Sequence, residues 1–296
     1  MFTGAAVSFA ADYKVCMSIN AYTATMSLED LPQDCFQLIL SLTSPRDACR
    51  SSLVSFSIRA MADSDSVWEI FLPEDCSEIM SRLVTPIPYS SNKDLFIKLC
   101  DPNLIDGGKK MFSIEKSTGK KCYILSARDL SIAWACNPLY WCWKRSLPAS
   151  ESRFAEVAEL RTIWWLEICG TMKAQMLSPN TVYGAYLVTK LASRAYGLDS
   201  LPSEVSLEVG DFKSQVAVYL GTNQKVTEVD ENVRPIRVLE ERLRERTDGW
   251  MEIELGSFYN DGCYCNKDVK MSLKEVKGAH LKGGLIVGGI EIRPKH

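Results

Sequence analysis

The sequence has few histidines and no excess of positive charge, and both shortages exclude kinds of site. Of its 296 residues only His280 and the terminal His296 are histidines, so no familiar four-ligand zinc spacing can be assembled. The formal net charge of −3 and the pI near 5.6 leave the chain without the basic face that nucleic-acid-binding proteins usually carry. We therefore expect no metal site, no cofactor and no nucleic-acid partner.

Long apolar runs and a disulfide framework are also missing. No run approaches the roughly 18 apolar residues of a membrane helix, so we expect no membrane anchor. Residues 1–26 lack a basic start and are interrupted by Asp12 and Lys14, which predicts a disordered leader rather than a secretory signal. The eleven cysteines are scattered without framework spacing, which favours a reducing compartment, the cytoplasm and nucleus.

Tryptophan, in contrast, is concentrated in one stretch. Residues 126–144 hold three of the seven tryptophans of the chain, Trp134, Trp141 and Trp143. Alternation predicts a short strand ending near Trp134, a turn at Asn137-Pro138, and a second strand from Tyr140 onward. Such residues are often interior packing, but so many on two neighbouring strands indicates that some face a groove.

Residues 27–73 show a helical pattern with recognisable caps. Asp30 precedes Leu31-Pro32, which places a proline in the first turn of one helix. Ser44 followed by Pro45 predicts the start of a second helix, and a carboxylate three residues after Ser44 completes something close to a capping box. The unit has more apolar side chains than so few residues can bury, which indicates a partner surface.

The pattern changes from helical to alternating near residue 111. Residues 74–110 read as a connector with a short helix over 92–100, and residues 111–296 as a second domain. We predict strands at 161–170, 181–191, 206–210, 215–221, 250–258, 269–276 and 285–293. The fold class is therefore α+β, a small all-α unit followed by an antiparallel β-sandwich of jelly-roll type.

The helical stretch resembles an F-box. The resemblance rests on LEDLPQDCFQLILSLTSPRDACRSSLVS and DSDSVWEIFLP. Within it, the segment SLTSPRDACR resembles that of the plant subgroup in which an F-box precedes a phloem lectin-like domain. It implies docking to a Skp-type adaptor and, through it, to a cullin-RING ubiquitin ligase. Carried over by position, the adaptor-facing residues are Leu31, Pro32, Ile39, Leu40, Leu53, Val54 and Trp68. Several of them could instead be the core of the unit.

The second half resembles the phloem protein 2 lectins typified by the tobacco agglutinin Nictaba. The matching blocks are ARDLSIAW with YWCWK, VAELRTIWWLEICGTM, DGWMEIELGSF and KGGLIVGGIEIRP. The resemblance implies a β-sandwich that binds chito-oligosaccharides or the GlcNAc-containing core of N-glycans. It places the binding aromatics at Trp134 and Trp141, and their acidic partners at Asp268 and Glu275.

The two acids differ in how well the strand pattern supports them. Glu275 shares one strand face with Val269, Met271 and Leu273, which places a carboxylate where an apolar side chain is expected. If the strand continues, a ligand, an arginine or a bulge must explain a charge at this buried position. If the strand ends at Leu273, Glu275 lies in water. Asp268 lies seven residues away, an odd number, so it faces the other side unless a loop or bulge intervenes.

These features lead to one main hypothesis and two rivals. The main one is a non-catalytic substrate receptor of a Skp-cullin-F-box ubiquitin ligase that holds target glycoproteins through their glycans, with avidity aided by a protein contact or by homodimers of the lectin domain. The first rival keeps the ligase role but gives the sandwich a sugar-independent protein target. The second, a glycoside hydrolase using Asp268 and Glu275, is disfavoured because the pair is oddly spaced on one strand and no other catalytic motif is present.

Overall fold

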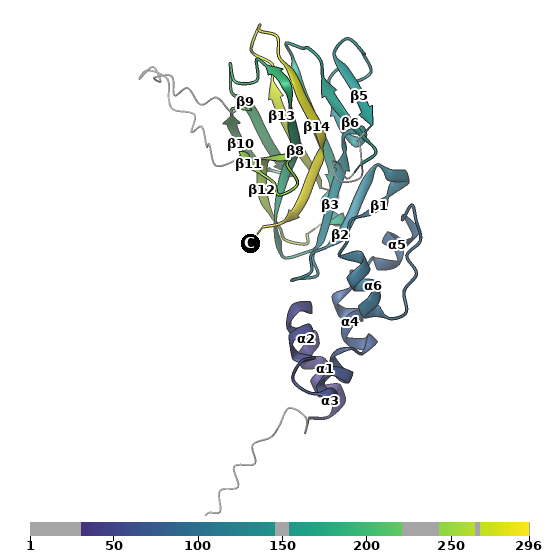
Figure 1. The fold of residues 1–296 in the computed structure, drawn as a ribbon. Helices are drawn as coiled ribbons and strands as arrows, with labels where there is room; N and C mark the ends of the chain where they lie inside the picture. Colours follow the sequence, from purple (N-terminus) through teal and green to yellow (C-terminus); the bar gives the residue numbers. More distant parts are fainter. Residues whose placement is uncertain (1–30, 146–153, 221–242, 264–266, 296) are drawn as a thin grey trace, which may run out of the picture.

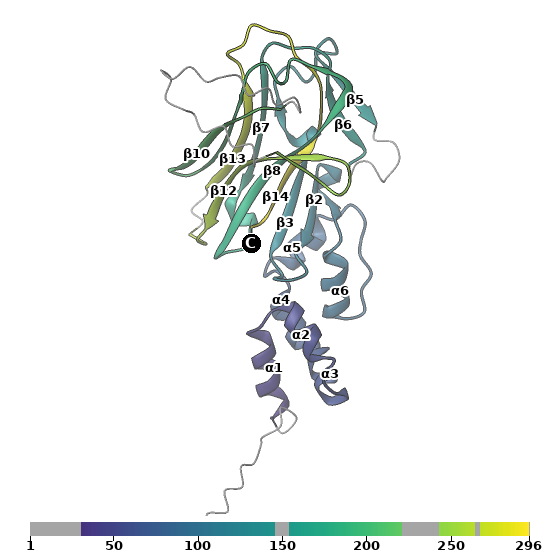
Figure 2. The same cartoon turned by 60° about the vertical axis from the view of Figure 1, so that its left-hand side comes forward.

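The computed structural model describes residues 31–145, 154–220, 243–263 and 267–295. The predicted leader lies outside these ranges. Short helices at the N-terminal end are followed by two antiparallel β-sheets that face each other, so the predicted α+β sandwich architecture is confirmed (Figure 1). In both views the helices lie beyond one end of the sandwich (Figure 2).

The helices follow the capping signals of the sequence. Ser44 caps the second helix, because its Oγ accepts a hydrogen bond from the Asp47 N–H at 3.1 Å and donates one to the Asp47 carboxylate at 2.7 Å. Pro32 is the N-cap of the first helix, with a non-helical ψ of 140°. The helices are α1 (Gln33–Ser41), α2 (Pro45–Ser51), α3 (Phe56–Ala62), α4 (Asp65–Phe71), α5 (Cys76–Ser81) and α6 (Asn92–Leu99).

Trp68 forms the centre of the helical unit. Its ring lies 5.1 Å from that of Phe96 and 5.6 Å from that of Phe71, and its indole N–H donates to the Ala62 carbonyl at 2.8 Å. Phe96 comes from α6, so the predicted helix of the connector supplies part of this core. The small F-box-like unit therefore buries its apolar side chains with help from residues that follow it.

The two sheets have different sizes within the described residues. One contains nine strands in the order β1-β2-β3-β14-β8-β12-β11, with β6 also pairing with β14 and β5 with β6. The other contains five in the order β10-β9-β13-β7-β4. The strands are β1 (Asn103–Ile105), β2 (Lys110–Ile114), β3 (Lys121–Ser126), β4 (Ser131–Ile132), β5 (Trp141–Arg145), β6 (Glu156–Leu160), β7 (Leu166–Lys173), β8 (Thr181–Tyr196), β9 (Ser203–Val209), β10 (Phe212–Val218), β11 (Leu243–Glu245), β12 (Met251–Asn260), β13 (Asp268–Glu275) and β14 (Gly283–Pro294).

Most predicted strands are confirmed, and the one at 161–170 is wrong at its start. Strand β6 ends at Leu160 and β7 begins at Leu166, so residues 161–165 form a loop. The run Ile163-Trp164-Trp165-Leu166 is apolar throughout and carries no alternation that could mark this break. β1 lies inside the stretch predicted as a connector, and β11 lies between the strands predicted at 215–221 and 250–258, where no strand was predicted.

The two units share one continuous core. Buried side chains of the helices and of both sheets belong to a single hydrophobic cluster. Lys121 of β3 pairs with Asp75 at 2.9 Å, and the turn between β2 and β3 packs on the helices at Gly119, whose φ is +71°. A Cβ on Gly119 would lie 3.1 Å from the Phe71 carbonyl oxygen, so glycine permits this close approach.

The alternation of β12 misleads about its second face. Met251, Ile253 and Leu255 share one face of this strand, so alternation predicts that Glu252 on the other face lies in water, but it is buried in a network of charges. Its carboxylate accepts hydrogen bonds from Arg293 at 2.8 Å and from Arg246 at 3.1 Å, and Arg246 also pairs with Glu291 at 2.6 Å. Arg246 follows edge strand β11, so the network ties that edge to β12 and β14.

We expect Glu252→Gln to lower the free energy of unfolding by about 3 kcal/mol, because it leaves two partly buried guanidinium groups with one carboxylate fewer. Urea unfolding followed by circular dichroism measures the change. The matched control is Glu208→Gln, which breaks an exposed cross-strand pair with Lys213 and should leave the free energy of unfolding almost unchanged. Equal losses in the two variants would contradict the structural role given to Glu252.

Candidate functional site

Four loops meet at the end of the sandwich that lies away from the helices: residues 133–140, 161–165, 197–202 and 276–282. Backbone hydrogen bonds join them. Arg161 N–H donates to the Tyr140 carbonyl at 2.8 Å, and Ile163 and Lys282 exchange bonds of 2.8 and 2.9 Å. His280 Nε2 lies 3.1 Å from the Gly197 carbonyl oxygen. This end is therefore a connected surface built from segments far apart in the sequence.

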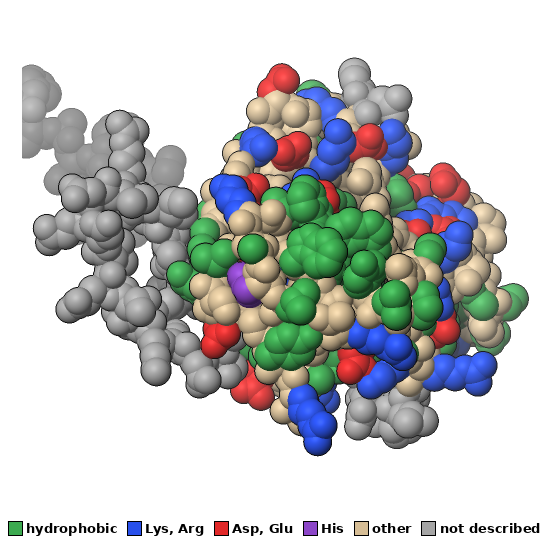
Figure 3. Space-filling view, turned by 90° about the horizontal axis from the view of Figure 1, so that it is seen from above, with side chains coloured by type: hydrophobic (Ala, Val, Ile, Leu, Met, Phe, Trp, Pro, Cys, Tyr) green, Lys and Arg blue, Asp and Glu red, His purple; other side chains and the backbone are tan. Residues whose placement is uncertain are grey.

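Three aromatic side chains form an open cluster on this surface. The Trp134 ring lies 5.8 Å from Tyr140 and 6.3 Å from Trp164, and Tyr140 and Trp164 are also 6.3 Å apart. Trp134 and Trp164 are 47% and 48% exposed. Seen from above, hydrophobic side chains gather at the centre of this end (Figure 3). Large aromatic rings exposed together in this way usually mark a binding surface.

The backbone turns sharply to present Trp134. The chain leaves the short strand β4, and Trp134 adopts a φ of +56°, which is uncommon for a residue other than glycine. Ala135 N–H bonds the Ile132 carbonyl at 3.1 Å and Asn137 N–H bonds the Trp134 carbonyl at 2.9 Å, so successive turns fix this conformation. A non-glycine residue held in this region is typical of functional sites.

Trp141 does not offer an open ring face, and the prediction of a platform there is wrong. It is 2% exposed, lies opposite Leu160 in the β5–β6 pair, and donates its indole N–H to the Ala133 carbonyl at 3.0 Å. Trp143 makes the equivalent bond to the Ala135 carbonyl at 3.1 Å. Both indoles therefore hold the 133–140 loop from beneath, on either side of Trp134.

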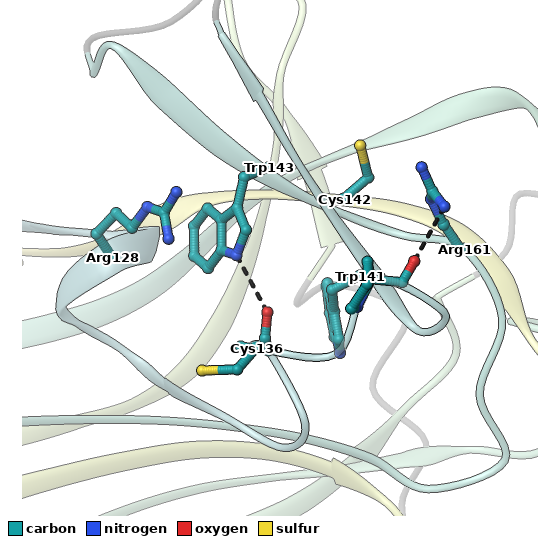
Figure 4. A pocket seen from close by; sticks show the side chains of 8 residues that line it. Arg128, Cys136, Trp141, Cys142, Trp143 and Arg161 are labelled. Carbon is teal, nitrogen blue, oxygen red and sulfur yellow. Dashed lines mark hydrogen bonds between the residues drawn. The ribbon is translucent and has the colours of Figure 1, made fainter.

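A pocket of about 350 Å³ lies beside the aromatic cluster, on the other side of the 133–140 loop. The Arg128 guanidinium lies 3.6 Å over the Trp143 ring, and Arg161 donates to the Pro138 carbonyl at 2.9 Å (Figure 4). The lining residues are Arg128, Ala135, Cys136, Pro138, Trp141, Cys142, Trp143 and Arg161. The loop thus separates an open aromatic surface from a cationic pocket.

Glu275 is buried at this end, but its carboxylate is already engaged. It forms an ion pair with Lys282, which is 1% exposed, and accepts the Gly278 N–H at 3.1 Å. Lys282 Nζ also donates to the Trp164 carbonyl at 2.7 Å. The predicted role of Glu275 as a sugar acceptor is therefore replaced by a structural one: a lysine compensates its charge, and the pair holds the loop of Trp164.

Asp268 lies at the other end of β13 and does not join the cluster. It pairs with Lys173 at 2.8 Å, and the seven residues to Glu275 span about 23 Å of strand. Its side chain projects from the opposite face of β13, as the odd spacing indicates. The placement of Asp268 in the site is therefore wrong.

Glu167, which the sequence pattern did not single out, is joined through its backbone to the loop that carries Trp134. Its backbone carbonyl accepts the Ala133 N–H at 3.0 Å, next to Trp134 in the chain. Its side chain accepts the Trp165 indole N–H at 3.0 Å and pairs with Lys274 at 2.9 Å, and these two bonds lower the pKa of the carboxyl group. The Trp164-Trp165 pair was the available signal, because two consecutive tryptophans cannot both point into one core from a regular strand.

The residues predicted to face the adaptor divide into two groups. Pro32, Ile39, Leu53 and Val54 are exposed, whereas Leu31 is partly buried and Leu40 and Trp68 belong to the core of the helical unit. The exposed apolar side chains of α1 and of the α2–α3 turn are Leu38, Ile39, Leu42, Leu53, Val54 and Phe56, with Leu53 and Phe56 at 84% and 88% exposure. We call this set the α1–α3 surface.

The described residues contain no group of three or more His, Cys, Asp or Glu side chains that could hold a metal ion. None of the helices in the described ranges is long and apolar enough to cross a membrane.

Comparison with known proteins identifies both halves of the chain. The family model of phloem protein 2 matches residues 120–294, and that of the F-box domain matches residues 28–70. The chain belongs to the F-box proteins that carry a phloem protein 2 domain. This order of domains is that of a substrate-recognition adaptor of a Skp-cullin-F-box ligase with a lectin-like domain.

Its relatives share this arrangement along most of their length. The chain is 46% identical to F-box protein PP2-B15 of Arabidopsis thaliana over 281 residues, 90% of this chain and 96% of the relative. It is 41% identical to F-box protein PP2-B10 of Arabidopsis thaliana over 270 residues, 90% of this chain and 93% of the relative. A solved structure, TmCBM61 in complex with β-1,4-galactotriose, is 10% identical, with 56% of this chain and 87% of that one covered, and its TM-score of 0.28 supports no argument.

We expect Lys282→Met to lower the free energy of unfolding by about 3–5 kcal/mol, because Glu275 is then a buried charge without its partner. Adding Glu275→Leu should recover most of that loss, since two apolar side chains of similar volume remove the orphaned charge. Urea unfolding of the two variants and the parent measures the difference. If the variant with both substitutions had a lower free energy of unfolding than Lys282→Met alone, the charge of Glu275 would not be what destabilises the single variant, and this explanation would be contradicted.

Proposed function

We propose that this chain is the substrate-recognition subunit of a Skp-cullin-F-box ubiquitin ligase and that its sandwich binds GlcNAc-containing glycans of target glycoproteins. The observation that carries the proposal is the open cluster of Trp134, Tyr140 and Trp164, at the opposite end of the molecule from the helices. A target held there leaves the α1–α3 surface free for the adaptor. The chain itself performs no chemistry in this proposal.

The chemistry of the cluster suits a sugar ring. A pyranose has an apolar face of C–H groups and a rim of hydroxyls, so its receptor needs flat aromatic faces and nearby hydrogen-bond acceptors. Trp134 and Trp164 provide half-exposed indole faces. Tyr140 adds a phenol whose ring centroid lies 5.8 Å from that of Trp134 and 6.3 Å from that of Trp164. Glu167 provides a charged carboxylate on the residue whose backbone carbonyl accepts a hydrogen bond from Ala133, in the loop of Trp134.

A second candidate keeps the ligase role and makes the sandwich a protein-binding module independent of sugar. Two observations favour it. Trp141 is sealed beneath the 133–140 loop, and Glu275 is engaged by Lys282, so two of the four residues that the lectin resemblance indicated are not open to a ligand. Exposed aromatic clusters also serve as anchors in protein interfaces.

Glycan binding should depend on the open indole of Trp134. We expect Trp134→Ala to weaken binding of a GlcNAc trimer at least about tenfold, because the stacking face is lost while the core stays intact. Titration calorimetry with the full chain measures this. Phe212→Ala is the matched control, since Phe212 is also 47% exposed but lies on β10, away from the cluster. No binding of any GlcNAc oligomer by the parent chain would favour the protein-binding candidate.

Adaptor binding should depend on the α1–α3 surface. We expect Leu53→Asp with Phe56→Asp to weaken capture of a Skp-type adaptor more than about 100-fold, because charges replace two apolar anchors in what would be a desolvated interface. Both side chains are exposed, so circular dichroism should show an unchanged fold. Phe212→Asp places the same charge on an exposed aromatic position of the sandwich and should leave capture unchanged. Undiminished capture by the double variant would contradict this part of the proposal.

A further inference from the structure

A second cavity, of about 380 Å³, lies where the helical unit meets the sandwich. Its walls come from α2, α4, α6 and the turn that joins β2 to β3 (Figure 1). The residues that line it are Pro45, Arg46, Cys49, Trp68, Phe96, Ile97, Cys100, Lys116 and Ser117. Its volume lies within the range of about 300–1,000 Å³ that small-molecule sites usually have.

The interior of this cavity is mostly apolar. Trp68 and Phe96 are buried, with ring centroids 5.1 Å apart and ring planes tilted by 60°, so they form a fixed wall rather than mobile side chains. Pro45 and Ile97 extend the apolar surface on either side. A ligand with an aromatic or branched hydrocarbon body would gain free energy by entering such a site.

Two cationic side chains complete the lining, and no acidic side chain contributes to it. Arg46 comes from α2 and Lys116 from the β2–β3 turn, so they approach the cavity from different units of the fold. In the portion of the chain that the structure describes, neither forms an ion pair, whereas the neighbouring Asp47 is engaged by Ser44 and Arg50. An anionic group at the mouth would therefore meet two uncompensated positive charges.

We propose that this cavity binds a small organic anion, with an apolar body against Trp68 and Phe96 and a carboxylate, sulfonate or phosphate group between Arg46 and Lys116. This assignment is independent of the glycan proposal, because the aromatic cluster lies at the other end of the sandwich. Such a ligand would touch both units at once and stabilise their contact beside the α1–α3 surface.

The two cysteines in the lining provide a local readout. Cys49 is exposed, and burial raises the pKa of the Cys100 thiol to about 11. Near pH 8, iodoacetamide should therefore alkylate Cys49 much faster than Cys100, since the thiolate is the reactive form. Cys263 is also exposed and lines neither pocket, so it reports on the rest of the protein in the same sample.

The test uses the full chain and anilinonaphthalene sulfonate, a bulky aromatic anion, with alkylation of each cysteine followed by mass spectrometry. We expect saturating dye to slow alkylation of Cys49 at least about fivefold and to leave the alkylation rate of Cys263 unchanged. The uncharged analogue phenylnaphthylamine should protect Cys49 at least about fivefold less well, because the two cations cannot engage it. Combining Arg46→Gln with Lys116→Gln should weaken dye protection about tenfold or more.

Lys120→Gln is the matched control, because Lys120 belongs to the same turn but does not line the cavity. It should leave protection of Cys49 unchanged. Four results would overturn the proposal. Three come from the dye: no protection of Cys49, equal protection in the parent and in the variant that combines Arg46→Gln with Lys116→Gln, or equal slowing of Cys49 and Cys263. The fourth is that a bound Skp-type adaptor shields Cys49 and abolishes protection by the dye, which would make the cavity part of the adaptor contact.

Discussion

A buried lysine–glutamate pair holds the loop end of the sandwich together. Glu275 ends β13, Lys282 precedes β14, and the ammonium group also reaches the Trp164 carbonyl in a third loop. Desolvation makes such a pair costly. Its ion pair and hydrogen bonds are directional, however, so they fix one arrangement of the loops, whereas apolar packing would tolerate several. The open position of Trp164 depends on that arrangement.

The other half of the aromatic cluster is fixed by backbone acceptors. Trp141 and Trp143 lie on the same face of β5 and donate to the carbonyls of Ala133 and Ala135, which flank Trp134. The two indole N–H groups thus find acceptors, and their hydrogen bonds support a loop in which Trp134 has a positive φ. A loop without these supports would lose the strained conformation, because an exposed turn offers little to offset its cost. Of the three tryptophans in this stretch, Trp141 and Trp143 therefore support the loop, and Trp134 is the one that the loop exposes.

Local signals predicted the elements and failed where partners lie far apart in the chain. The Ser44 cap and the alternation of β13 and β14 depend on neighbouring residues, so the sequence was sufficient to place them. The alternation also marked Glu275 as a buried acid, but not Lys282 as its partner, because that contact crosses a loop. Likewise, the family pattern gave Trp134 and Trp141 the same role, and only the pairing of β5 with β6 shows that one is sealed. Alternation alone predicts that Glu252 faces water, because its arginine partners are distant in the chain: Arg246 lies in the loop after β11 and Arg293 on β14.

The shared core gives the two ends of the molecule a fixed relation. Trp68 of the F-box packs on Phe96 of the connector, and the β2–β3 turn packs on the same helices at Gly119, so no free linker separates the units. The α1–α3 surface and the Trp134 cluster are then presented at a constant distance and angle. An adaptor that must place its target near a ligase benefits from this rigidity, since each bound target is held in one orientation instead of being averaged over many. The junction, rather than either binding surface, sets that geometry.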